Sequence, residues 1–263
     1  MNDTDTNPHI PVLLEDTVSG LAVKKSGIYL DCTIGFCGHS SRIFEKLNDK
    51  GKLIGIDFDP YALEYSRSKL SEYGDNFELH LSNYKNIKSI LHKSDIEFID
   101  GILFDLGISS YQVDSGYKGL SYRTDSKLDM NMDGEGYNLK EYLHSSTKEE
   151  IADTIYNYGE ERGSRKIASS IKKYASSNNM STNFDLVQAV EDVVPKRFLN
   201  KTLSRVFQSM RIKINNELHH IYTSISEAID LLNDGGRIAV ITFHSIEDRL
   251  VKNIFKSFSR GDS

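Results

Sequence analysis

Short apolar segments alternate with segments of helical character over the first 106 residues, and this alternation constrains the fold most strongly. The predicted strands cover residues 27–33, 52–57, 77–81 and 100–106. Between the second and third strands, Asp59-Pro60 supplies an N-cap followed by proline at the first helical position. Strands separated by helices form right-handed βαβ units. We therefore predict an α/β fold with a doubly wound, mostly parallel, Rossmann-like sheet.

This pattern is interrupted between residues 114 and 208. Turn-rich sequence is followed there by helical periodicity around residues 148–158, 160–175 and 184–193. The α/β pattern then resumes with a helix over 215–232, a Gly235-Gly236 turn and a strand over 237–243. We predict one discontinuous α/β domain, residues 1–113 and 209–263, split by a mainly helical insert of residues 114–208.

The charge of the chain is unevenly distributed. The net charge of −6 argues against indiscriminate binding of nucleic acid. Residues 114–213 nevertheless carry 16 basic and 14 acidic side chains, against 16 and 24 in the rest. Residues 195–213 contain no acid, but do contain Lys196, Arg197, Lys201, Arg205, Arg211 and Lys213, with Phe198 and Phe207 interleaved. This composition suits a surface that grips RNA, although a solvated helix face has the same composition.

Other features of the composition exclude several classes of protein. Cys32 and Cys37 lack Cys-x-x-Cys spacing, so neither a disulfide scaffold nor a zinc site is expected, and we expect no metal. No stretch approaches the roughly 20 apolar residues that a membrane-spanning helix needs. The N-terminal segment is acidic and polar, unlike a secretory signal. We expect a cytoplasmic protein without a membrane partner.

The predicted strand ends carry the chemistry of a nucleoside site. A turn containing Gly35 and Gly38 lets the backbone approach a ligand, and the following helix start presents free N–H groups. Asp57 ends the second strand, where an acid accepts hydrogen bonds from ribose hydroxyls, and Asp105 ends the fourth. The alternative is that the glycines only make a tight turn and the acids cap loops. Spacing alone does not separate a dinucleotide from S-adenosylmethionine.

Seven blocks of sequence carry a family resemblance. They are residues 9–15 (HIPVLLE), 31–40 (DCTIGFCGHS), 54–60 (IGIDFDP), 100–112 (DGILFDLGISSYQ), 158–162 (YGEER), 205–212 (RVFQSMRI) and 243–249 (FHSIEDR). In this order they resemble the bacterial 16S ribosomal RNA cytosine N(4)-methyltransferase family, which is class I and uses S-adenosylmethionine. That family methylates the exocyclic amine of a decoding-centre cytidine in the small ribosomal subunit, and its fold carries a helical insert.

The resemblance implies a set of cofactor-binding residues: Cys37, Gly38, His39, Asp57, Tyr84, Asp105 and Gln112. Asp57 would take the ribose, and Gly38 would admit the methionine portion. Tyr84 would stack on adenine, unless it belongs to the core. Gln112 would hydrogen-bond the cofactor, unless it is a loop amide satisfied by backbone.

The implied reaction displaces the sulfonium methyl group with a cytosine amine, which is a poor nucleophile. It needs an acceptor for the amine hydrogen bonds and no metal. The candidate catalytic set is Asp105, Ser109, Ser110 and Tyr111, with Tyr111 as a stacking platform for a base withdrawn from its helix. Asp105 could instead serve only the cofactor.

The substrate RNA would meet a second set of residues: Lys196, Arg197, Lys201, Arg205, Arg211 and His244. A structural loop cap is an equally good interpretation of His244 and the Glu247-Asp248-Arg249 that follows it. Residues 158–162 are interpreted mainly as architecture of the insert.

The chain departs from the family pattern in three ways. The family usually has glycine where Cys37 stands and arginine where Lys118 and Asn131 stand. It also normally continues beyond the position of Ser263 with further strands and a basic tail, so C-terminal strands are expected to be missing here.

Three competing functions remain. A DNA amino-methyltransferase would share the chemistry, but those enzymes carry a proline-proline-aromatic loop where this chain has Ser109-Ser110-Tyr111. A nicotinamide oxidoreductase would share the strand-end acids. A catalytically silent RNA-binding assembly factor would share the fold. A homodimer is left open.

Overall fold

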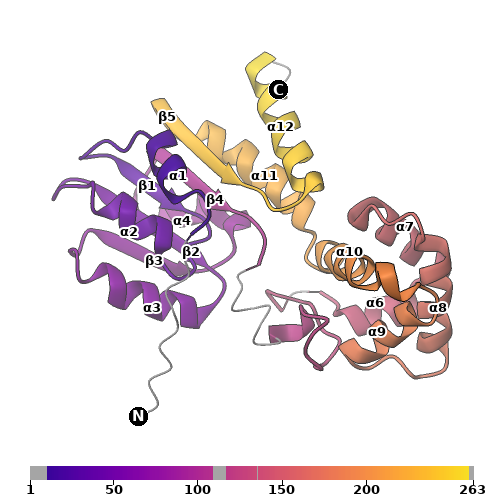
Figure 1. The fold of residues 1–263 in the computed structure, drawn as a ribbon. Coiled ribbons are helices and arrows are strands. Elements are labelled where there is room, and N and C mark those ends of the chain that lie inside the picture. Colours follow the sequence, from indigo (N-terminus) through magenta and orange to yellow (C-terminus); the bar gives the residue numbers. More distant parts are fainter. Residues whose placement is uncertain (1–10, 109–116, 135, 261–263) are drawn as a thin grey trace, which may run out of the picture. The chain divides into compact units, whose positions relative to one another are not determined.

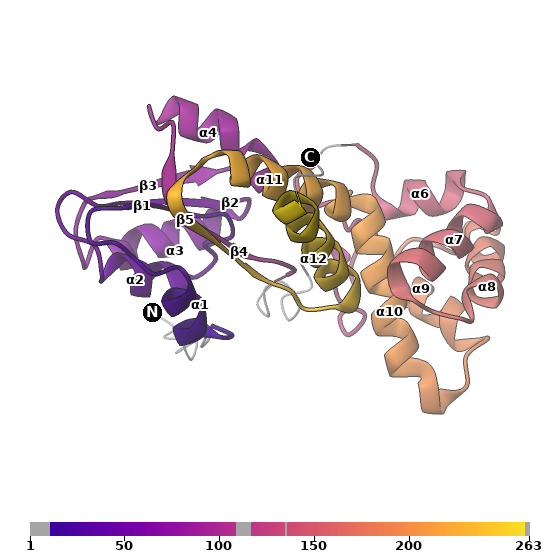
Figure 2. The same ribbon diagram turned by 90° about the horizontal axis from the view of Figure 1, so that it is seen from above.

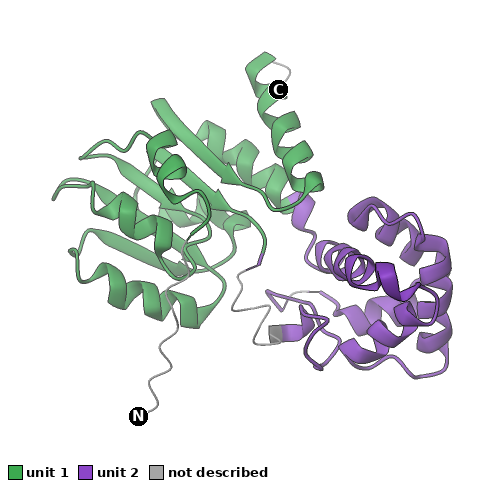
Figure 3. Ribbon diagram, viewed as in Figure 1, with its two compact units in different colours: residues 1–107, 220–263 green, residues 108–219 purple. Residues whose placement is uncertain are grey.

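The chain forms two compact units in this computed structural model, which describes residues 11–108, 117–134 and 136–260. Unit 1 comprises residues 1–107 and 220–263, and unit 2 comprises residues 108–219 (Figure 3). The boundary predicted after residue 113 lies outside the described residues. The boundary predicted after residue 208 falls inside a helix, α10 (Lys196–Ile214), and the division comes later, within α11 (Glu217–Asp230).

Unit 1 is built on a five-stranded sheet (Figure 1). Its strands are β1 (Ile28–Asp31), β2 (Lys52–Asp57), β3 (Phe77–Leu81), β4 (Ile99–Asp105) and β5 (Leu232–Ile241). They lie in the order β3-β2-β1-β4-β5, and every neighbouring pair is parallel. The predicted parallel, doubly wound fold is confirmed. The strand order reverses between β1 and β4, which is where open α/β sheets bind ligands.

Helices cover both faces of this sheet. Figure 2 shows α1 (Leu14–Gly20), α2 (Gly38–Phe44) and α3 (Pro60–Leu70) on one face, with α4 (Ile87–Lys93) and α11 on the other. The short 3-10 helix η1 (Tyr84–Asn86) leads into α4, and α12 (Ser245–Arg260) follows β5. Because β2 and β4 are covered on both sides, their residues are almost all buried, as is typical of central parallel strands.

Local signals for α3 are confirmed in detail. Asp59 is its N-cap, with the carboxylate accepting a hydrogen bond from the Tyr61 N–H at 2.9 Å, and Pro60 occupies the first helical position. The helix expected after the glycine turn is α2, which is short and ends at Phe44.

The Gly235-Gly236 pair interrupts β5 rather than preceding it. The strand begins at Leu232, and its pairing with β4 is irregular between Leu232 and Arg237. Gly235 lies in the left-handed region, with φ +73°, which accounts for the irregularity. The strand ends at Ile241, two residues earlier than predicted.

Unit 2 is helical, as predicted for the insert. After the 3-10 turn η2 (Tyr117–Gly119) it contains α6 (Leu139–Ser145), α7 (Lys148–Gly159), α8 (Ser164–Ser176), α9 (Asn183–Glu191) and α10. These helices share a core of their own that includes Ile151, Ile167, Leu186, Val206 and Met210. The helix predicted from residue 160 begins later, because Glu160 takes a left-handed conformation that ends α7.

Capping residues explain two of the helix starts in unit 2. Asn138 and Glu141 form a capping box at α6, a helix that the periodicity did not predict, and Thr147 and Glu150 form another at α7. Among the described residues, no helix is both long and apolar enough to cross a membrane.

Candidate functional site

The loop between β1 and α2 has an unusual backbone. Gly35 and Cys37 both lie in the left-handed region, with φ +49° and +66°. Hydrogen bonds tie the loop to the sheet and to itself: the Ile34 N–H donates to the Ile56 carbonyl at 3.0 Å, and the Cys37 N–H donates to the Ile34 carbonyl at 2.8 Å. The left-handed conformation at Cys37 gives a physical reason for the glycine that the family usually has there.

Cys37 is itself fully buried at the N-cap of α2. Burial raises the pKa of its thiol to about 11, so the sulfur is protonated at neutral pH. Its carbonyl and sulfur both accept from the Ser41 hydroxyl, at 2.6 and 3.5 Å. Cys37 therefore contributes backbone shape to the site and no nucleophile.

Asp57 joins the end of β2 to this loop. Its two carboxylate oxygens accept backbone N–H groups, one from Gly35 at 2.8 Å and one from Asp59 at 2.9 Å. Burial raises the pKa of Asp57 to about 6, although both hydrogen bonds oppose that rise. Each carboxylate oxygen has a second lone pair, so the group retains acceptor capacity for the hydroxyls of a ribose.

Asp31, at the end of β1, holds the β1–α2 loop through hydrogen bonds. It is buried, and its oxygens accept from the Ser40 hydroxyl at 2.7 Å and the Thr33 N–H at 3.1 Å. Burial raises the pKa of this carboxyl as well. The sequence prediction did not assign Asp31 to the site, because the predicted strand continued to residue 33, whereas β1 ends at Asp31.

Gly38 and His39 begin α2 under the segment that precedes α1. A side chain on Gly38 would bring its Cβ to 2.1 Å from Pro11, so only glycine fits there. His39 is buried, and its Nε2 donates to the Val12 carbonyl at 3.0 Å while its Nδ1 lies 3.7 Å from the Asp105 carboxylate. The imidazole thus connects the helix start to the end of β4.

Asp105 lies across the switch point from the β1 loop. Its N–H donates to the Thr33 hydroxyl at 2.7 Å, which fixes the end of β4 beside the end of β1. Its side chain is 28% exposed, so the carboxylate is reachable from solvent. Ser109, Ser110, Tyr111 and Gln112, the other residues predicted on the following loop, lie outside the described residues.

Tyr84 lies in η1, on the same edge of the sheet. Its ring packs edge-to-face against Phe104 of β4 at 5.9 Å, and its carbonyl accepts from the Ser224 hydroxyl at 3.2 Å. The residue is half-buried. It is therefore packed on the sheet with part of its surface still available.

These groups fit a cofactor that contains a nucleoside. The carboxyl ends of β1, β2 and β4 bring Asp31, Asp57 and Asp105 to one edge, around a loop whose backbone is shaped by left-handed residues. Partly buried carboxylates for hydroxyls, a glycine at a helix start and a half-buried tyrosine are the groups that a ribose, an amino-acid portion and a purine need. The residues present suit S-adenosylmethionine.

The predicted RNA-contacting residues separate into two groups. Lys196, Arg197 and Lys201 are exposed at the start of α10, and the Arg197 guanidinium lies 4.6 Å from the centroid of the exposed Phe198 ring. Arg205 is half-buried and pairs with Glu161 at 3.2 Å. Phe207, predicted as an RNA-facing aromatic, instead lies in the unit 2 core, edge-to-face with Tyr122.

Arg211 does not belong to the exposed basic face. It is buried, and its guanidinium makes two hydrogen bonds to Glu217, at 2.8 and 3.0 Å. The pair links the end of α10 to the start of α11. A buried arginine with a dedicated carboxylate serves the fold, so we do not carry Arg211 forward as an RNA contact.

His244 caps α12. Its Nδ1 accepts from the Glu247 N–H at 3.3 Å, its carbonyl accepts from the Asp248 N–H at 3.1 Å, and the buried Glu247 carboxylate accepts in return from the Phe243 N–H at 3.0 Å. This arrangement resembles a capping box with histidine in the N-cap role, except that the Glu247 carboxylate accepts from the residue before the N-cap. These hydrogen bonds support the interpretation of His244 as a structural loop cap.

The blocks at 158–162 and 205–212 pack on each other. A side chain on Gly159 would come within 2.6 Å of the Arg205 carbonyl, so glycine permits the close crossing of α7 and α10. The Gln208 amide donates to the Tyr158 carbonyl at 3.0 Å, and the Glu161 carboxylate accepts a hydrogen bond from the Arg205 guanidinium. The interpretation of residues 158–162 as insert architecture is confirmed.

Lys118 and Asn131, the two positions where the family usually has arginine, are in contact with each other. The Lys118 ammonium donates to the carbonyls of Asn131 and Met132, at 2.8 and 3.1 Å. Asn215, at the C-cap of α10, holds the same segment through Met130 and Met132, each at 2.8 Å. Sequence reasoning missed Asn215, because a capping asparagine carries no signal for a distant partner.

Comparison with known proteins identifies the family. The model of the MraW methylase family matches residues 6–263. "Ribosomal RNA small subunit methyltransferase H" of Clostridium botulinum is 43% identical over 256 residues, which is 96% of this chain and 82% of that protein. The protein of the same name from Fusobacterium nucleatum is 40% identical over 252 residues, 95% of this chain and 80% of that protein.

Solved structures show more distant similarity. A putative rRNA-methylase from Clostridium thermocellum is 19% identical over 36% of this chain and 51% of that chain, with a TM-score of 0.33. A putative methyltransferase from Streptococcus mutans, solved with SAH, is 25% identical over 38% of this chain and 55% of that chain, with a TM-score of 0.32. The chain belongs to the MraW methylase family, and it is an S-adenosylmethionine-dependent methyltransferase.

Proposed function

We propose that this enzyme transfers a methyl group from S-adenosylmethionine to the exocyclic N(4) amine of a decoding-centre cytidine in 16S ribosomal RNA. The observation that carries the proposal is the identity of 40–43% over 95–96% of the chain with relatives named ribosomal RNA small subunit methyltransferase H. The nucleotide and the N(4) position come from the family resemblance of the seven sequence blocks. The acidic strand ends around the β1 loop supply the cofactor site that this reaction needs.

The chemistry requires an acceptor beside the amine. S-adenosylmethionine, when bound, supplies an activated methyl group. As the cytosine nitrogen forms its bond to the methyl carbon, the carbon–sulfur bond breaks towards sulfur and the amine gives up one proton. Asp105 is our candidate for the group that accepts hydrogen bonds from the amine and favours loss of that proton, because its carboxylate is partly exposed at the end of β4. Ser109, Ser110 and Tyr111 complete the proposed set.

The start of α10 is our candidate surface for the RNA. Lys196, Arg197 and Lys201 are exposed within the first two turns, and Figure 2 shows these turns extending beyond the other helices of unit 2. Phe198, 51% exposed, lies under Arg197 where no core packing requires it. Cations beside an exposed ring suit phosphates and an unstacked base of single-stranded RNA. Arg205 stands at the edge of this surface, already paired with Glu161.

The test is methyl transfer from labelled S-adenosylmethionine to three substrates: small ribosomal subunits that lack the modification, their protein-free RNA, and duplex DNA. We expect label in the subunits and none in DNA. Label in DNA alone would favour the DNA amino-methyltransferase, and cofactor binding without transfer to any substrate would favour the silent assembly factor.

A further inference from the structure

The β1–α2 loop is held against α3 by contacts that the cofactor assignment does not use. The Ser66 hydroxyl of α3 donates to the Gly35 carbonyl at 2.7 Å. The next residue, Phe36, packs edge-to-face on two tyrosines of the same helix. Its ring centroid is 6.1 Å from that of Tyr61 and 5.4 Å from that of Tyr65, at interplanar angles of 73° and 79°. Tyr61 and Tyr65 are four residues apart, so they present neighbouring rings on one face of α3.

This loop requires support from outside because its backbone is costly. Phe36 stands between Gly35 and Cys37, the two residues in the left-handed region. A residue with a Cβ in that region is strained, and it persists only where the surroundings over-determine it. Ile34 and Cys37 pack into the core cluster that also contains Leu63 of α3, and Gly35 has no side chain, so Phe36 is the loop residue that adds ring contacts with the outer face of α3.

The two tyrosines are not explained by the core of unit 1. Tyr61 and Tyr65 are 54% and 41% exposed, whereas Ala62, Leu63 and Leu70 form the buried face of α3. An edge-to-face pair contributes stability beyond the area that it buries, so two such pairs can offset the strain of one left-handed residue.

The support also reaches the ribose acceptor. The Gly35 N–H donates to Asp57 while the Gly35 carbonyl accepts from Ser66. Any shift of the loop away from α3 therefore moves the group that orients one oxygen of Asp57. A change in ring packing at Phe36 is transmitted to the carboxylate through one intervening residue.

We propose that Phe36, Tyr61 and Tyr65 form an aromatic brace, a set of positioning residues that holds the β1–α2 loop in its cofactor-binding shape. The inference rests on the placement of S-adenosylmethionine in the proposed function, and it is independent of which RNA is methylated. Losing the brace lowers cofactor affinity and leaves the methyl-transfer step unchanged, because none of the three rings is assigned to the reacting atoms.

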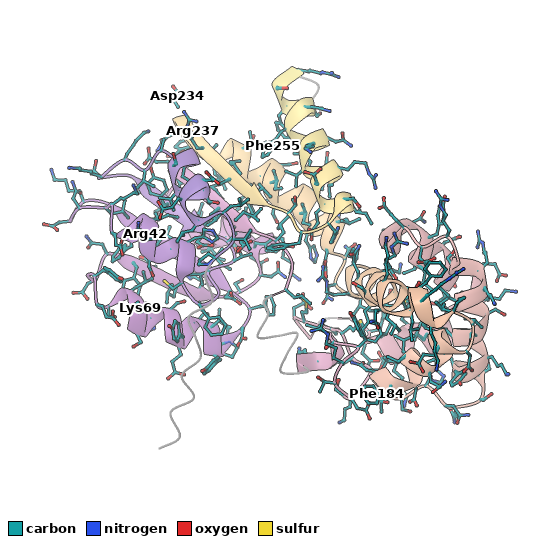
Figure 4. The ribbon with its side chains drawn as sticks, viewed as in Figure 1. Arg42, Lys69, Phe184, Asp234, Arg237 and Phe255 are labelled. Carbon is teal, nitrogen blue, oxygen red and sulfur yellow. The ribbon has the colours of Figure 1, made fainter. Side chains whose placement is uncertain are left out.

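The first measurement is the dissociation constant of S-adenosylmethionine by calorimetry for Phe36→Ala, Tyr65→Ala, Tyr65→Phe and the parent. We expect a loss of about three- to tenfold in affinity for each alanine variant, the size of one or two ring pairs. Tyr65→Phe keeps the ring and should bind as the parent does. The matched control is Tyr73→Ala: Tyr73 is 43% exposed just beyond α3, with the Lys69 ammonium (labelled in Figure 4) 5.7 Å from its ring centroid.

Steady-state kinetics separate positioning from general damage to the fold. Tyr65→Ala should raise KM for S-adenosylmethionine, with kcat at saturating cofactor and KM for RNA unchanged. Parent-like affinity in both alanine variants would overturn the brace, and so would a loss in Tyr65→Phe as large as in Tyr65→Ala. A parent that binds the cofactor but methylates no RNA would contradict the proposed substrate, while the affinity series would still decide the brace.

Discussion

At the scale of single residues, we assign two roles to the Asp57 carboxylate. It accepts the backbone N–H groups that shape the β1–α2 loop, and it retains lone pairs for the ribose that we propose it binds. The same burial that makes these hydrogen bonds strong raises its pKa to about 6. The residue that organises the site is therefore also the one whose charge is sensitive to mildly acidic pH.

This pKa predicts how cofactor affinity depends on pH. The charged carboxylate accepts from ribose hydroxyls better than the protonated acid, and with a pKa of about 6 the charged fraction falls about tenfold between pH 7 and pH 5. Affinity for S-adenosylmethionine should fall by a similar factor over that range, as measured by calorimetry. Asp57→Asn should bind more weakly at pH 7 and show a flatter profile. A parent profile that is already flat would remove the ribose role of Asp57.

Asp105 should behave differently from Asp57. Because we propose that Asp105 accepts hydrogen bonds from the amine, Asp105→Ala should lower kcat by about a hundredfold or more while changing cofactor affinity less. Rapid-quench measurement of the transfer step, paired with calorimetry, checks this. An affinity loss as large as that of Asp57→Ala, with the transfer rate retained at saturation, would assign Asp105 to the cofactor alone.

Strand-end acids were predictable at this scale, whereas the partners of basic residues were not. Asp57 and Asp105 stand where short apolar runs end, and that position alone specifies their edge of the sheet. Nothing in the basic segment distinguishes Arg211, which is committed to Glu217, from Arg197, which is exposed. Helical phase would have predicted that Phe207 joins Leu203 and Met210 in the core.

At the scale of elements, the crossing of α7 and α10 depends on one glycine. Gly159→Ala would place a Cβ 2.6 Å from the Arg205 carbonyl, and backbone cannot move aside as a flexible side chain can. We expect a loss of about 1–3 kcal/mol in the free energy of unfolding, measured with denaturant. Gly20→Ala is the control, because Gly20 ends α1 with no heavy atom near the added Cβ. Equal stability of the two variants would contradict the close crossing.

The basic start of α10 makes a second prediction at this scale. Replacing Lys196, Arg197 and Lys201 with alanine should weaken RNA binding and reduce the slope of log affinity against log salt by about two to three, since each lost phosphate contact contributes about 0.7–0.9. The matched control removes the same charge elsewhere in unit 2, by replacing the exposed Lys148, Lys166 and Lys173 with alanine. An unchanged slope in the α10 variant would make this segment a solvated helix face.

At the scale of the whole molecule, each unit has a core of its own, and the two cores were predictable to different degrees. The alternation of strands and helices predicted the sheet of unit 1, because parallel strands need crossover helices. The helical character of unit 2 followed from periodicity. The boundary predicted after residue 208 falls within α10, which continues its amphipathic pattern to Ile214, and the two compact units divide within α11. A continuous helix gives no signal in sequence of where one compact unit ends.

The most direct test of the proposed function is mass spectrometry of nucleosides from small ribosomal subunits that lack the modification, after reaction with this enzyme and labelled S-adenosylmethionine. We predict N(4)-methylcytidine as the labelled nucleoside, at one site, with the yield greatly reduced in Asp105→Ala. Label confined to a methylated carbon of the base, to a ribose oxygen or to a different base would contradict an amine-directed transfer to cytidine.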